Sequence, residues 1–390
     1  MREMKDSNYG YLGIVPQSWK VDKIKYHLKA LGMRNPGNAQ VLSVYREYGV
    51  IPKDSRDDNH NVTSEDTSNY RYVRKGDFVI NKMKAWQGSM AVSRYTGIVS
   101  PAYYVYKFTD DALNRGYFHY LLRSKLYAAE FARISGGIRV GQWDLSAYNF
   151  ENTMLLIPPL EEQGKIATFL DSQCSEIDAI SADIQKEIEI LEQYKRSLVF
   201  EAISKGINGE KTANASSDIW KEIPQSWKLV DIKYLFEIVK RIAGREGYNI
   251  LSVTQKGLKV KDISGNQGQI AENYSGYQFV FPSDYVMNHM DLLTGWIDCS
   301  DQFGVTSPDY RVFRLRDKTQ NDTEYYKYVM QCCYMCRIFY SLGQGVSTLG
   351  RWRLQTSAFM NFKVPVPPLH EQKEIARYLN DKCKEIDLSI

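Results

Sequence analysis

The sequence contains no apolar run long enough to cross a bilayer, and its first residues, Met1–Asp6, do not form the apolar core of a signal peptide. We therefore expect a cytoplasmic protein. The chain has 6 cysteines in 390 residues, which fits free thiols in a reducing compartment. Cys332, Cys333 and Cys336 lie close together in sequence. A structural zinc site needs a fourth ligand, and none is near, so we expect thiols on a helix instead.

The sequence also lacks the motifs of common catalytic sites. It has no Walker A phosphate loop, no G-x-S-x-G and no H-E-x-x-H, and its 5 histidines are scattered. The Asn/Asp-Pro-Pro-aromatic motif typical of amino-methyltransferases is absent, because both Pro-Pro pairs precede leucine. These absences predict a chain that is not itself an enzyme and that binds no metal or cofactor of its own.

A duplication of a whole domain is the main positive feature of the sequence. Val15–Lys20, which reads VPQSWK, returns as Ile223–Lys228 at an offset of 208 residues. Ile157–Gln163, which reads IPPLEEQ, returns as Val366–Gln372 at an offset of 209. A repeat of this length indicates two copies of a domain rather than a solenoid of short units. The copies diverge between these landmarks, which favours one fold reading two different ligands, with neutral drift after duplication as the alternative.

Strand-like and helix-like segments mix within each copy without a regular βαβ alternation, which predicts an α+β fold built on a mixed sheet. The expected strands are 41–45, 77–81 and 102–108 in the first copy and 250–254, 284–288 and 310–315 in the second. The expected helices are 117–134 and 325–342.

A long helix of the coiled-coil type is expected between the copies. Pro158-Pro159 cannot lie inside a helix, and Lys205-Gly206 is typical of a helix end. Apolar residues between them recur every three or four positions, a stripe that needs a partner helix. We therefore expect a subunit-assembly surface at Ile177, Ile180, Ile184, Ile188, Leu191 and Leu198.

The second copy begins the same helix but stops at Ile390, so its spacer is expected to be incomplete. The landmarks divide the chain into five segments. They are a first recognition domain at 1–158, a spacer helix at 159–209, a linker at 210–217, a second recognition domain at 218–367 and the start of a second spacer helix at 368–390.

The distribution of charge is more informative than the net charge of +4. Leu160–Lys205 carries ten acidic and five basic side chains, a net charge of −5, so the rest of the chain carries +9. Basic domains suit the neutralisation of nucleic-acid phosphates. A mildly basic solvated surface is the alternative interpretation.

Two segments in each domain are candidates for DNA contact. One is a hairpin loop, basic and aromatic in the first domain and different in the second. The other is a glycine-rich turn, where backbone can approach a ligand and Arg or Gln can fork onto base edges or phosphates. For Trp143 and Trp352, in these turns, we expect core packing. The DNA-binding candidates are Lys82, Lys84, Trp86, Arg94, Arg139 and Gln142 in the first domain, and Gln255, Lys256, His289, Gln344, Ser347, Thr348, Arg351 and Arg353 in the second.

The whole pattern resembles the specificity subunit of type I restriction-modification systems. The resemblance rests on Pro-x-x-Trp at the start of each half, Pro-Pro-Leu-x-Glu-Gln, and the helix segments Ile166–Asp171, Ile177-Asp178 and Tyr194–Leu198. It covers essentially the whole chain in duplicate. It implies two target-recognition domains, separated by helices that pair antiparallel, which read a bipartite asymmetric target in double-stranded DNA with one half-site per domain.

The resemblance also implies partners. They are adenine methyltransferase (modification) subunits that use S-adenosylmethionine, and restriction/translocase subunits that use ATP and Mg, whereas this chain binds none of these cofactors. The short final helix departs from the family pattern and puts self-contained pairing of the two spacers in doubt. Two other classes of function stay open, a stand-alone sequence-specific DNA-binding regulator and a helix-mediated assembly scaffold.

Overall fold

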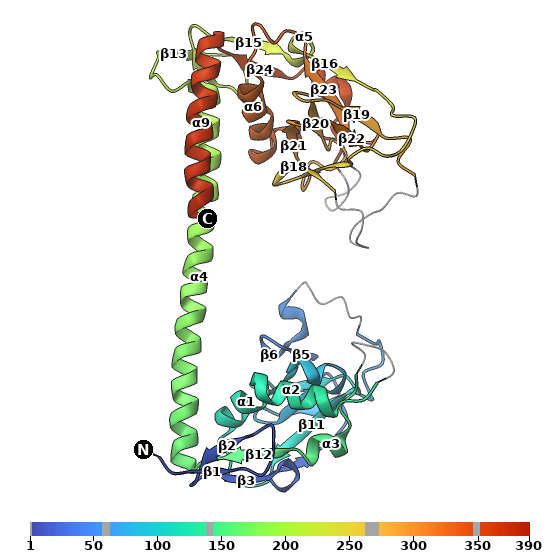
Figure 1. Cartoon of the computed structure of the whole chain (residues 1–390), viewed down its shortest axis with the longest axis vertical. Helices are drawn as coiled ribbons and strands as arrows, with labels where there is room; N and C mark the ends of the chain where they lie inside the picture. Colours follow the sequence, from blue (N-terminus) through green and yellow to red (C-terminus); the bar gives the residue numbers. More distant parts are fainter. Residues whose placement is uncertain (1, 57–62, 138–142, 262–272, 346–351) are drawn as a thin grey trace. The chain divides into compact units, whose positions relative to one another are not determined.

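The computed structural model describes residues 2–56, 63–137, 143–261, 273–345 and 352–390. The chain divides into two compact units, residues 1–181 and 182–390 (Figure 1). The long helix α4 (Leu160–Lys205) belongs to both, because the division falls within it. Each unit is described by itself below.

A four-stranded antiparallel sheet forms the centre of the first unit, with the strand order β4-β11-β8-β9. The side chains of β8 alternate between two apolar clusters. Phe78 and Ile80 pack with α1 and α2 on one face, whereas Val79 packs in a smaller cluster on the other. Both faces are therefore covered, which explains the unbroken apolar run of this strand. The elements are β4 (Leu28–Ala30), β8 (Phe78–Asn81), β9 (Met90–Val92), β11 (Tyr103–Phe108), α1 (Arg115–Arg123) and α2 (Lys125–Ile134).

The second unit repeats this sheet with the order β16-β23-β20-β21. Its central strand alternates in the same way, with Tyr285 and Met287 in the large core and Val286 in the small cluster. The α+β prediction is confirmed. The elements are β16 (Phe236–Val239), β20 (Tyr285–Met287), β21 (Ile297–Cys299), β23 (Arg311–Leu315), α6 (Thr323–Met335) and α7 (Ile338–Ser341).

Short two-stranded sheets surround each central sheet, and each has its counterpart in the other unit. In the first unit they are β1 (Met4–Asp6) with β2 (Ile14–Pro16), β3 (Lys20–Lys23) with β12 (Met154–Ile157), β5 (Leu42–Tyr45) with β6 (Gly49–Pro52), and β7 (Arg71–Val73) with β10 (Gly97–Val99). In the second they are β13 (Thr212–Asn214) with β14 (Glu222–Pro224), β15 (Lys228–Asp231) with β24 (Lys363–Val366), β17 (Leu251–Thr254) with β18 (Gly257–Val260), and β19 (Gln278–Val280) with β22 (Gly304–Thr306). The remaining short helices are η1 (Ile24–Tyr26), η2 (Lys53–Ser55), η3 (Lys82–Gln87), α3 (Ala147–Glu151), α5 (Ile232–Leu235) and α8 (Thr356–Met360).

Two expected helices are each broken into a pair. Ser124 ends α1 in an extended conformation, and its hydroxyl accepts a hydrogen bond from the Tyr127 amide, so it is the N-cap of α2. In the second unit Arg337 takes the left-handed conformation, with φ +56°, between α6 and α7. The two short helices of each pair pack into the same apolar core, so the apolar pattern continues past the break and does not reveal it.

The segment 210–217, expected to be a linker, contains β13, which pairs with β14. The same pairing occurs at the start of the first unit between β1 and β2. Residues 212–214 are therefore part of the second copy of the fold. Polar composition suggested a linker, but a two-stranded ribbon at the surface needs few apolar residues.

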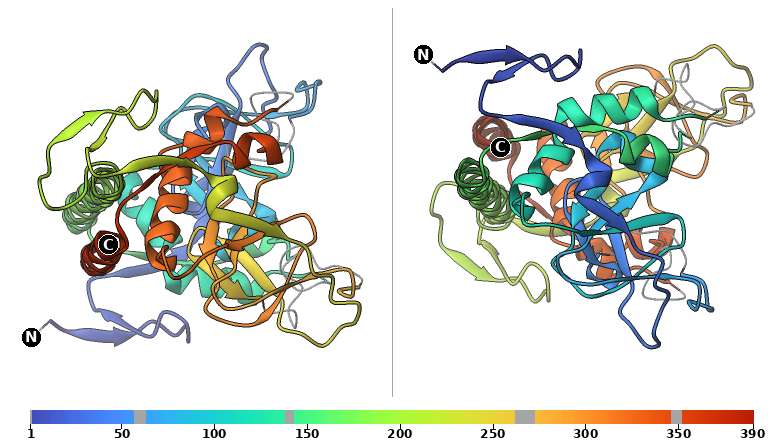
Figure 2. Two further views of the ribbon diagram at one scale, coloured as in Figure 1. Left: turned by 90° about the horizontal axis from the view of Figure 1, so that it is seen from above. Right: turned by 90° about the horizontal axis from the view of Figure 1, so that it is seen from below.

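The ends of the spacer helix fall where the sequence predicts. Helix α4 begins at Leu160 after Pro158-Pro159 and ends at Lys205, and Gly206 follows with φ +74°. Within the second unit, α9 (Leu369–Ser389) lies beside the last turns of α4 (Figures 1 and 2). Lys195 Nζ lies 2.6 Å from Asp387 Oδ1 near one end of this contact, and Gly206 lies against Glu371 at the other, so the helices run antiparallel. In the described part of the chain, no helix is both long and apolar enough to span a membrane.

A buried glutamine joins the spacer helix to the body of each unit. Gln163 Nε2 donates to the carbonyls of Ala112 and Pro158 at 2.9 and 2.8 Å, and its Oε1 accepts from the Asn114 amide at 2.8 Å. Asn114 is the N-cap of α1. The glutamine therefore ties the first turn of α4 to the first turn of α1.

The second unit repeats this junction atom for atom. Gln372 Nε2 donates to the Pro367 carbonyl at 2.9 Å, and its Oε1 accepts from the amide of Asp322, the N-cap of α6, at 2.8 Å. Both glutamine side chains are fully buried. The Glu-Gln pairs seen in the sequence are thus structural.

The repeated tryptophan closes the same junction. Trp19 Nε1 donates to Glu162 at 3.1 Å, and Trp227 Nε1 donates to Glu371 at 2.8 Å. The two carboxylates differ in their other neighbour. Arg2 donates to both oxygens of Glu162 at 2.6 Å, and this hydrogen bonding lowers the pKa of Glu162.

The residue equivalent to Arg2 in the second unit is Glu210, whose carboxylate accepts from Ser226 at 2.9 Å as Arg2 donates to Ser18 in the first. No cation replaces the arginine at Glu371 in the described structure. Burial, with a contribution from Glu210, raises the pKa of Glu371. One of its carboxylate oxygens is buried without a hydrogen-bond partner.

The substitution Gln372→Ala tests the junction. It leaves the Asp322 amide and the Pro367 carbonyl without their partner, so we expect the free energy of unfolding of the second unit to fall by about 2–3 kcal/mol. Chemical denaturation of the full chain measures this loss. Gln173→Ala, at an exposed position of α4, is the control and is expected to change little. Equal effects of the two substitutions would contradict a structural role for Gln372.

Candidate DNA interface

In the first unit the hairpin of β8 and β9 ends in the 3-10 helix η3. Lys84 on η3 is exposed, and Trp86 is half-buried with its Nε1 donating to the Met83 carbonyl at 3.1 Å. The left-handed conformation of Gly88, with φ +84°, ends the turn and lets β9 return. The loop thus presents a cation and an aromatic ring at the end of a rigid hairpin.

The glycine-rich turn lies directly beside this loop. Gly136 and Asp144 exchange backbone hydrogen bonds of 3.1 and 2.8 Å, which close the turn, and the Leu145 amide donates to the Lys82 carbonyl at 3.1 Å. The ring centroids of Trp86 and Trp143 are 5.2 Å apart. The two segments predicted separately therefore form one surface, which we call the recognition edge of the first unit. Arg139 and Gln142 lie outside the described residues.

Arg94 does not join this edge. It follows β9, whose Val92 pairs with Phe78, so it lies at the opposite end of the hairpin from η3. It is exposed. Burial lowers the pKa of His119 on α1, and the charges of Arg123 and Arg94 lower it further. Proximity in sequence to Lys82 suggested a single patch. In the antiparallel pair, however, Lys82 lies at the turn, whereas Arg94 lies beyond the open end of the hairpin.

The second unit builds the same edge with other side chains. Gln344 and Arg353 exchange two backbone hydrogen bonds of 3.0 Å, and the Leu354 amide donates to the His289 carbonyl at 3.0 Å, as Leu145 does to Lys82. Gly345 packs flat on the Trp352 ring, where a Cβ atom would come within 2.9 Å of ring carbon, so glycine is required there. Ser347, Thr348 and Arg351 lie outside the described residues.

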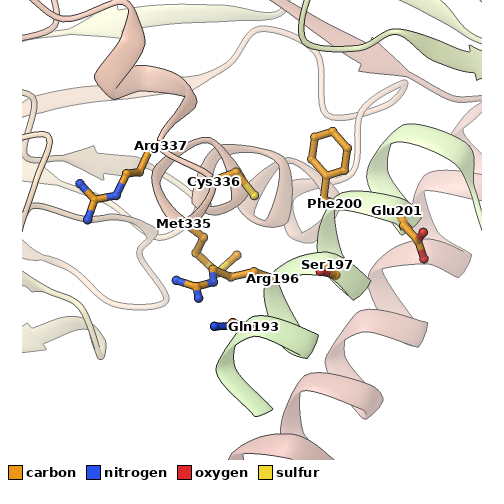
Figure 3. Close-up of a pocket in the computed structure, with 8 residues that line it drawn as sticks. All are labelled: Gln193, Arg196, Ser197, Phe200, Glu201, Met335, Cys336 and Arg337. Carbon is orange, nitrogen blue, oxygen red and sulfur yellow. The ribbon is translucent and has the colours of Figure 1, made fainter. Parts of the chain in front are cut away.

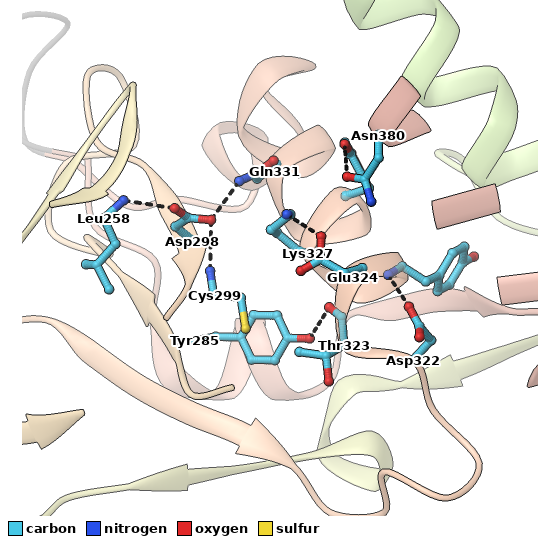
Figure 4. A network of polar contacts seen from close by, with 12 residues as sticks. Leu258, Tyr285, Asp298, Cys299, Asp322, Thr323, Glu324, Lys327, Gln331 and Asn380 are labelled. Atoms are coloured by element: carbon cyan, nitrogen blue, oxygen red, sulfur yellow. Dashed lines mark hydrogen bonds and ion pairs between the residues drawn. The ribbon is translucent and has the colours of Figure 1, made fainter. Parts of the chain in front are cut away.

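A second hairpin adds Gln255 and Lys256 to the edge of the second unit. Both residues are exposed in the turn between β17 and β18, and Gln255 Nε2 lies 3.5 Å from the Thr294 carbonyl. Asp298 holds the hairpin in place, because it accepts from the Leu258 amide at 2.8 Å and from Gln331 on α6 at 3.1 Å (Figure 4).

The first unit has an equivalent hairpin that the sequence analysis missed. Arg46 and Tyr48 are exposed in the turn between β5 and β6, and the Arg56 guanidinium lies 4.3 Å from the Tyr48 ring. Arg123 on α1 donates to the Glu47 carbonyl at 3.0 Å and holds this turn. The repeat offset places Arg46 at the position of Gln255, so the nomination of one implied the other.

The electrostatics of the two edges differ. Lys82 Nζ pairs with Asp144 at 2.9 Å, whereas the equivalent positions of the second unit hold His289 and Arg353, which are both basic residue types. Burial, with the nearby charges of Arg311 and Arg353, lowers the pKa of His289 to about 4. His289 is therefore neutral near pH 7, and its buried Nδ1 has no hydrogen-bond partner.

The two tryptophans of the glycine-rich turns are not core residues in the full sense. Trp352 is half-buried and packs at the margin of the large core of the second unit. Trp143 is half-buried against Trp86.

The apolar stripe of α4 is largely exposed. Ile177, Ile180 and Ile184 are 62%, 58% and 52% exposed, and Ile188 and Leu191 are half-buried. Leu198 differs, since it packs against the core of the second unit. It therefore stabilises that unit rather than forming part of an open surface.

An open hollow of about 680 Å³ lies in the second unit beside this stripe, between α4 and the end of α6 (Figure 3). Arg196 and Phe200 of α4 face Met335 and Cys336 across it. Cys336 Sγ lies 3.6 Å from Cys332 Sγ, and both belong to the expected helix thiols. In the described part of the chain, no group of three or more His, Cys, Asp or Glu side chains is placed to hold a metal ion.

The lowered pKa of His289 predicts a pH dependence of stability. The unfolded chain takes up a proton near pH 6.5, whereas folded His289 does so only near pH 4, so the second unit loses stability as the pH falls through this window. His289→Asn is expected to make the loss smaller by about 2 kcal/mol between pH 7 and pH 4. Denaturant unfolding at several pH values measures it. The exposed His370→Asn serves as control, and equal profiles for both variants would refute the assignment.

Comparison with known proteins matches residues 19–190 and 224–389 to the type I restriction modification DNA specificity domain. The type I restriction enzyme MjaVIII specificity subunit of Methanocaldococcus jannaschii is 24% identical over 96% of this chain and 87% of its own length. The EcoBI specificity subunit of Escherichia coli is 23% identical over 69% of this chain and 58% of its own length.

A solved structure from a study of complex assembly and conformational transition in the type I R-M system shares the fold. Its TM-score is 0.65 at 14% identity, and the match covers 96% of this chain and 92% of that one. The duplicated junction lies within the two matched segments, with Trp19, Gln163 and Gln372 inside them. The chain belongs to the type I restriction-modification DNA specificity family.

Proposed function

We propose that this chain is the DNA-specificity subunit of a type I restriction-modification complex and that each unit reads one half of a bipartite, asymmetric target. The observation that carries the proposal is the pair of recognition edges. Identical backbone hydrogen bonds hold both edges, at Leu145–Lys82 and Leu354–His289, whereas the side chains on them differ in charge and size. One scaffold with two sets of side chains suits two unlike half-sites.

The chain acts without catalysis of its own in this proposal. Methylation of adenine requires the base to leave the helix and enter an active site, and that work falls to adenine methyltransferase subunits with S-adenosylmethionine. Restriction/translocase subunits use ATP and Mg. The specificity subunit positions both on double-stranded DNA. The family match supports this division of labour, since it describes a DNA specificity domain.

Block exchange tests the assignment of half-sites. Residues 41–157 or 250–366 are replaced by the equivalent block of a relative, and the methylated motif of cells that carry the intact system is mapped by single-molecule sequencing. We expect one half-site to change with each block and the other to persist, because the edges lie within the blocks and the tryptophans Trp19 and Trp227 lie outside them.

The reciprocal exchange is the control for each chimera. A change in both half-sites, or in neither, would overturn the assignment of one half-site to one unit. Sequence-specific binding without a methyltransferase partner would point to a stand-alone regulator, and absence of duplex binding would point to a scaffold.

We further propose that the exposed stripe of α4 binds the methyltransferase subunits. Ile184→Asp with Leu191→Asp places two carboxylates on the stripe, and desolvation of these charges is expected to weaken the complex by at least tenfold. Co-purification and analytical ultracentrifugation measure the assembly. The fold should persist, because Ile184 is 52% exposed.

Ala182→Asp with Gln193→Asp is the matched control. The two positions lie on the opposite side of α4 from Ile184 and Leu191 at 100° per residue, and both are exposed. Assembly should survive in this variant. Intact assembly of the Ile184 and Leu191 variant would remove the stripe from the proposal. Leu198→Asp should instead destabilise the second unit, whose core Leu198 contacts.

A further inference from the structure

A basic hollow of about 480 Å³ opens beside the edge strand β16 of the second unit, away from the residues of the recognition edge. Arg314 pairs with Glu237 at 2.6 Å, and Arg316 approaches the same carboxylate at 3.7 Å. Arg241 pairs with the buried Asp284. The hollow therefore has more cations than carboxylates. Its charged side chains are Arg241, Arg314, Arg316, Lys318, Glu237 and Asp284.

The first unit is basic at the same place in the fold. Lys107 on β11 faces Lys29 on the edge strand β4, and the register puts this pair where Arg314 faces Glu237 in the second unit. Both lysines are exposed, and no ion pair neutralises either in the described part of the chain. Arg74 and Arg115 complete the cluster around the buried Asp77. Burial raises the pKa of Asp77, and the charges of Arg74, Arg115 and Lys107 only partly oppose this.

Aromatic rings hold one guanidinium in each cluster. Arg115 lies 5.5 Å from the Phe108 ring, and Arg241 lies 4.7 Å from the Phe281 ring. A ring at this distance favours a defined position for the guanidinium, and Arg241 also donates to Asp284.

Both units carry positive charge at this place in the fold, although different positions of the repeat supply it. Apart from Lys107 and Arg314, the cations of the two clusters stand at positions that are not equivalent in the repeat. Like charges directly opposite each other on a sheet destabilise it, so the Lys29–Lys107 pair costs stability in the free chain. An anionic ligand removes that cost.

We propose that these clusters, Lys29, Arg74, Lys107 and Arg115 in the first unit and Arg241, Arg314, Arg316 and Lys318 in the second, bind backbone phosphates of the DNA duplex. This inference rests on the proposed DNA-binding function and goes beyond it. The clusters supply affinity that is independent of sequence and fix the position of each unit on the duplex, whereas the recognition edges select bases.

The variant Lys29→Gln with Lys107→Gln tests the first cluster in the full chain. Binding of a labelled duplex of mixed sequence is measured by fluorescence anisotropy between about 50 and 200 mM salt. Loss of two phosphate contacts is expected to make the slope of log K against log salt shallower by about 2. Affinity should fall alike for duplexes of different sequence, because phosphates carry no base information.

Lys20→Gln with Lys228→Gln is the matched control. It removes the same total charge from two exposed, equivalent positions on β3 and β15, outside the central sheets. Its salt slope should equal that of the natural chain. A control slope as shallow as the test slope would show that net charge alone matters and would overturn the inference.

Folding does not confound this test. Removal of the like charges of Lys29 and Lys107 should leave the melting temperature unchanged or raise it. Lys318→Gln in the second unit, an exposed position, provides a second variant whose slope should be shallower by about 1. Failure of the natural chain to bind duplex DNA would refute the proposed function itself. Salt-dependent binding with unaltered slopes in both variants would refute only the phosphate clusters.

Discussion

The fully buried glutamine at each junction is the constraint on which the rest of the fold depends. Each glutamine side chain binds two kinds of backbone group that would otherwise lack a partner. One is the N-cap amide of α1 or α6, and the other is the carbonyl of the first proline of the Pro-Pro pair. One side chain therefore sets the direction in which the spacer helix leaves the body of each unit. The tryptophan-to-glutamate hydrogen bond covers the same joint from outside, and the variable segments are built on this fixed base.

The contacts that hold the two surface segments in place are separate from the side chains that these segments carry. Backbone hydrogen bonds, which do not depend on side-chain identity, join the hairpin loop to the glycine-rich turn in both units. The side chains on these segments can then change without loss of the fold, as the exchange of Lys82 and Asp144 for His289 and Arg353 shows. The cations of the two proposed phosphate clusters would act differently, because a contact to phosphate depends on charge and not on base identity.

The duplication made much of this fold predictable from sequence. Strands, spacer ends and the α+β class follow from apolar patterns and Pro-Gly punctuation, and the repeat offset doubles each observation. The apolar pattern did not reveal the helix breaks at Ser124 and Arg337, because these depend on local backbone conformation and do not interrupt the apolar periodicity. Sequence proximity to Lys82 predicted Arg94 as a DNA contact, and helical periodicity predicted Leu198 as part of the assembly surface. Their real surroundings depend on strand pairing and on helix packing, which no local window contains.

The exchange of Arg2 for Glu210 makes the two junctions respond to acid in opposite ways. The ion pair with Arg2 stabilises the first unit while Glu162 is charged, so that contribution disappears as the pH falls through the lowered pKa. Glu371 has a raised pKa, so its charged form costs stability at neutral pH, and a falling pH relieves the cost. A falling pH therefore relieves the cost at Glu371 first and removes the Arg2 ion pair only at a lower pH. The two junctions therefore share their glutamine and tryptophan hydrogen bonds but differ in how protonation of their glutamates affects stability.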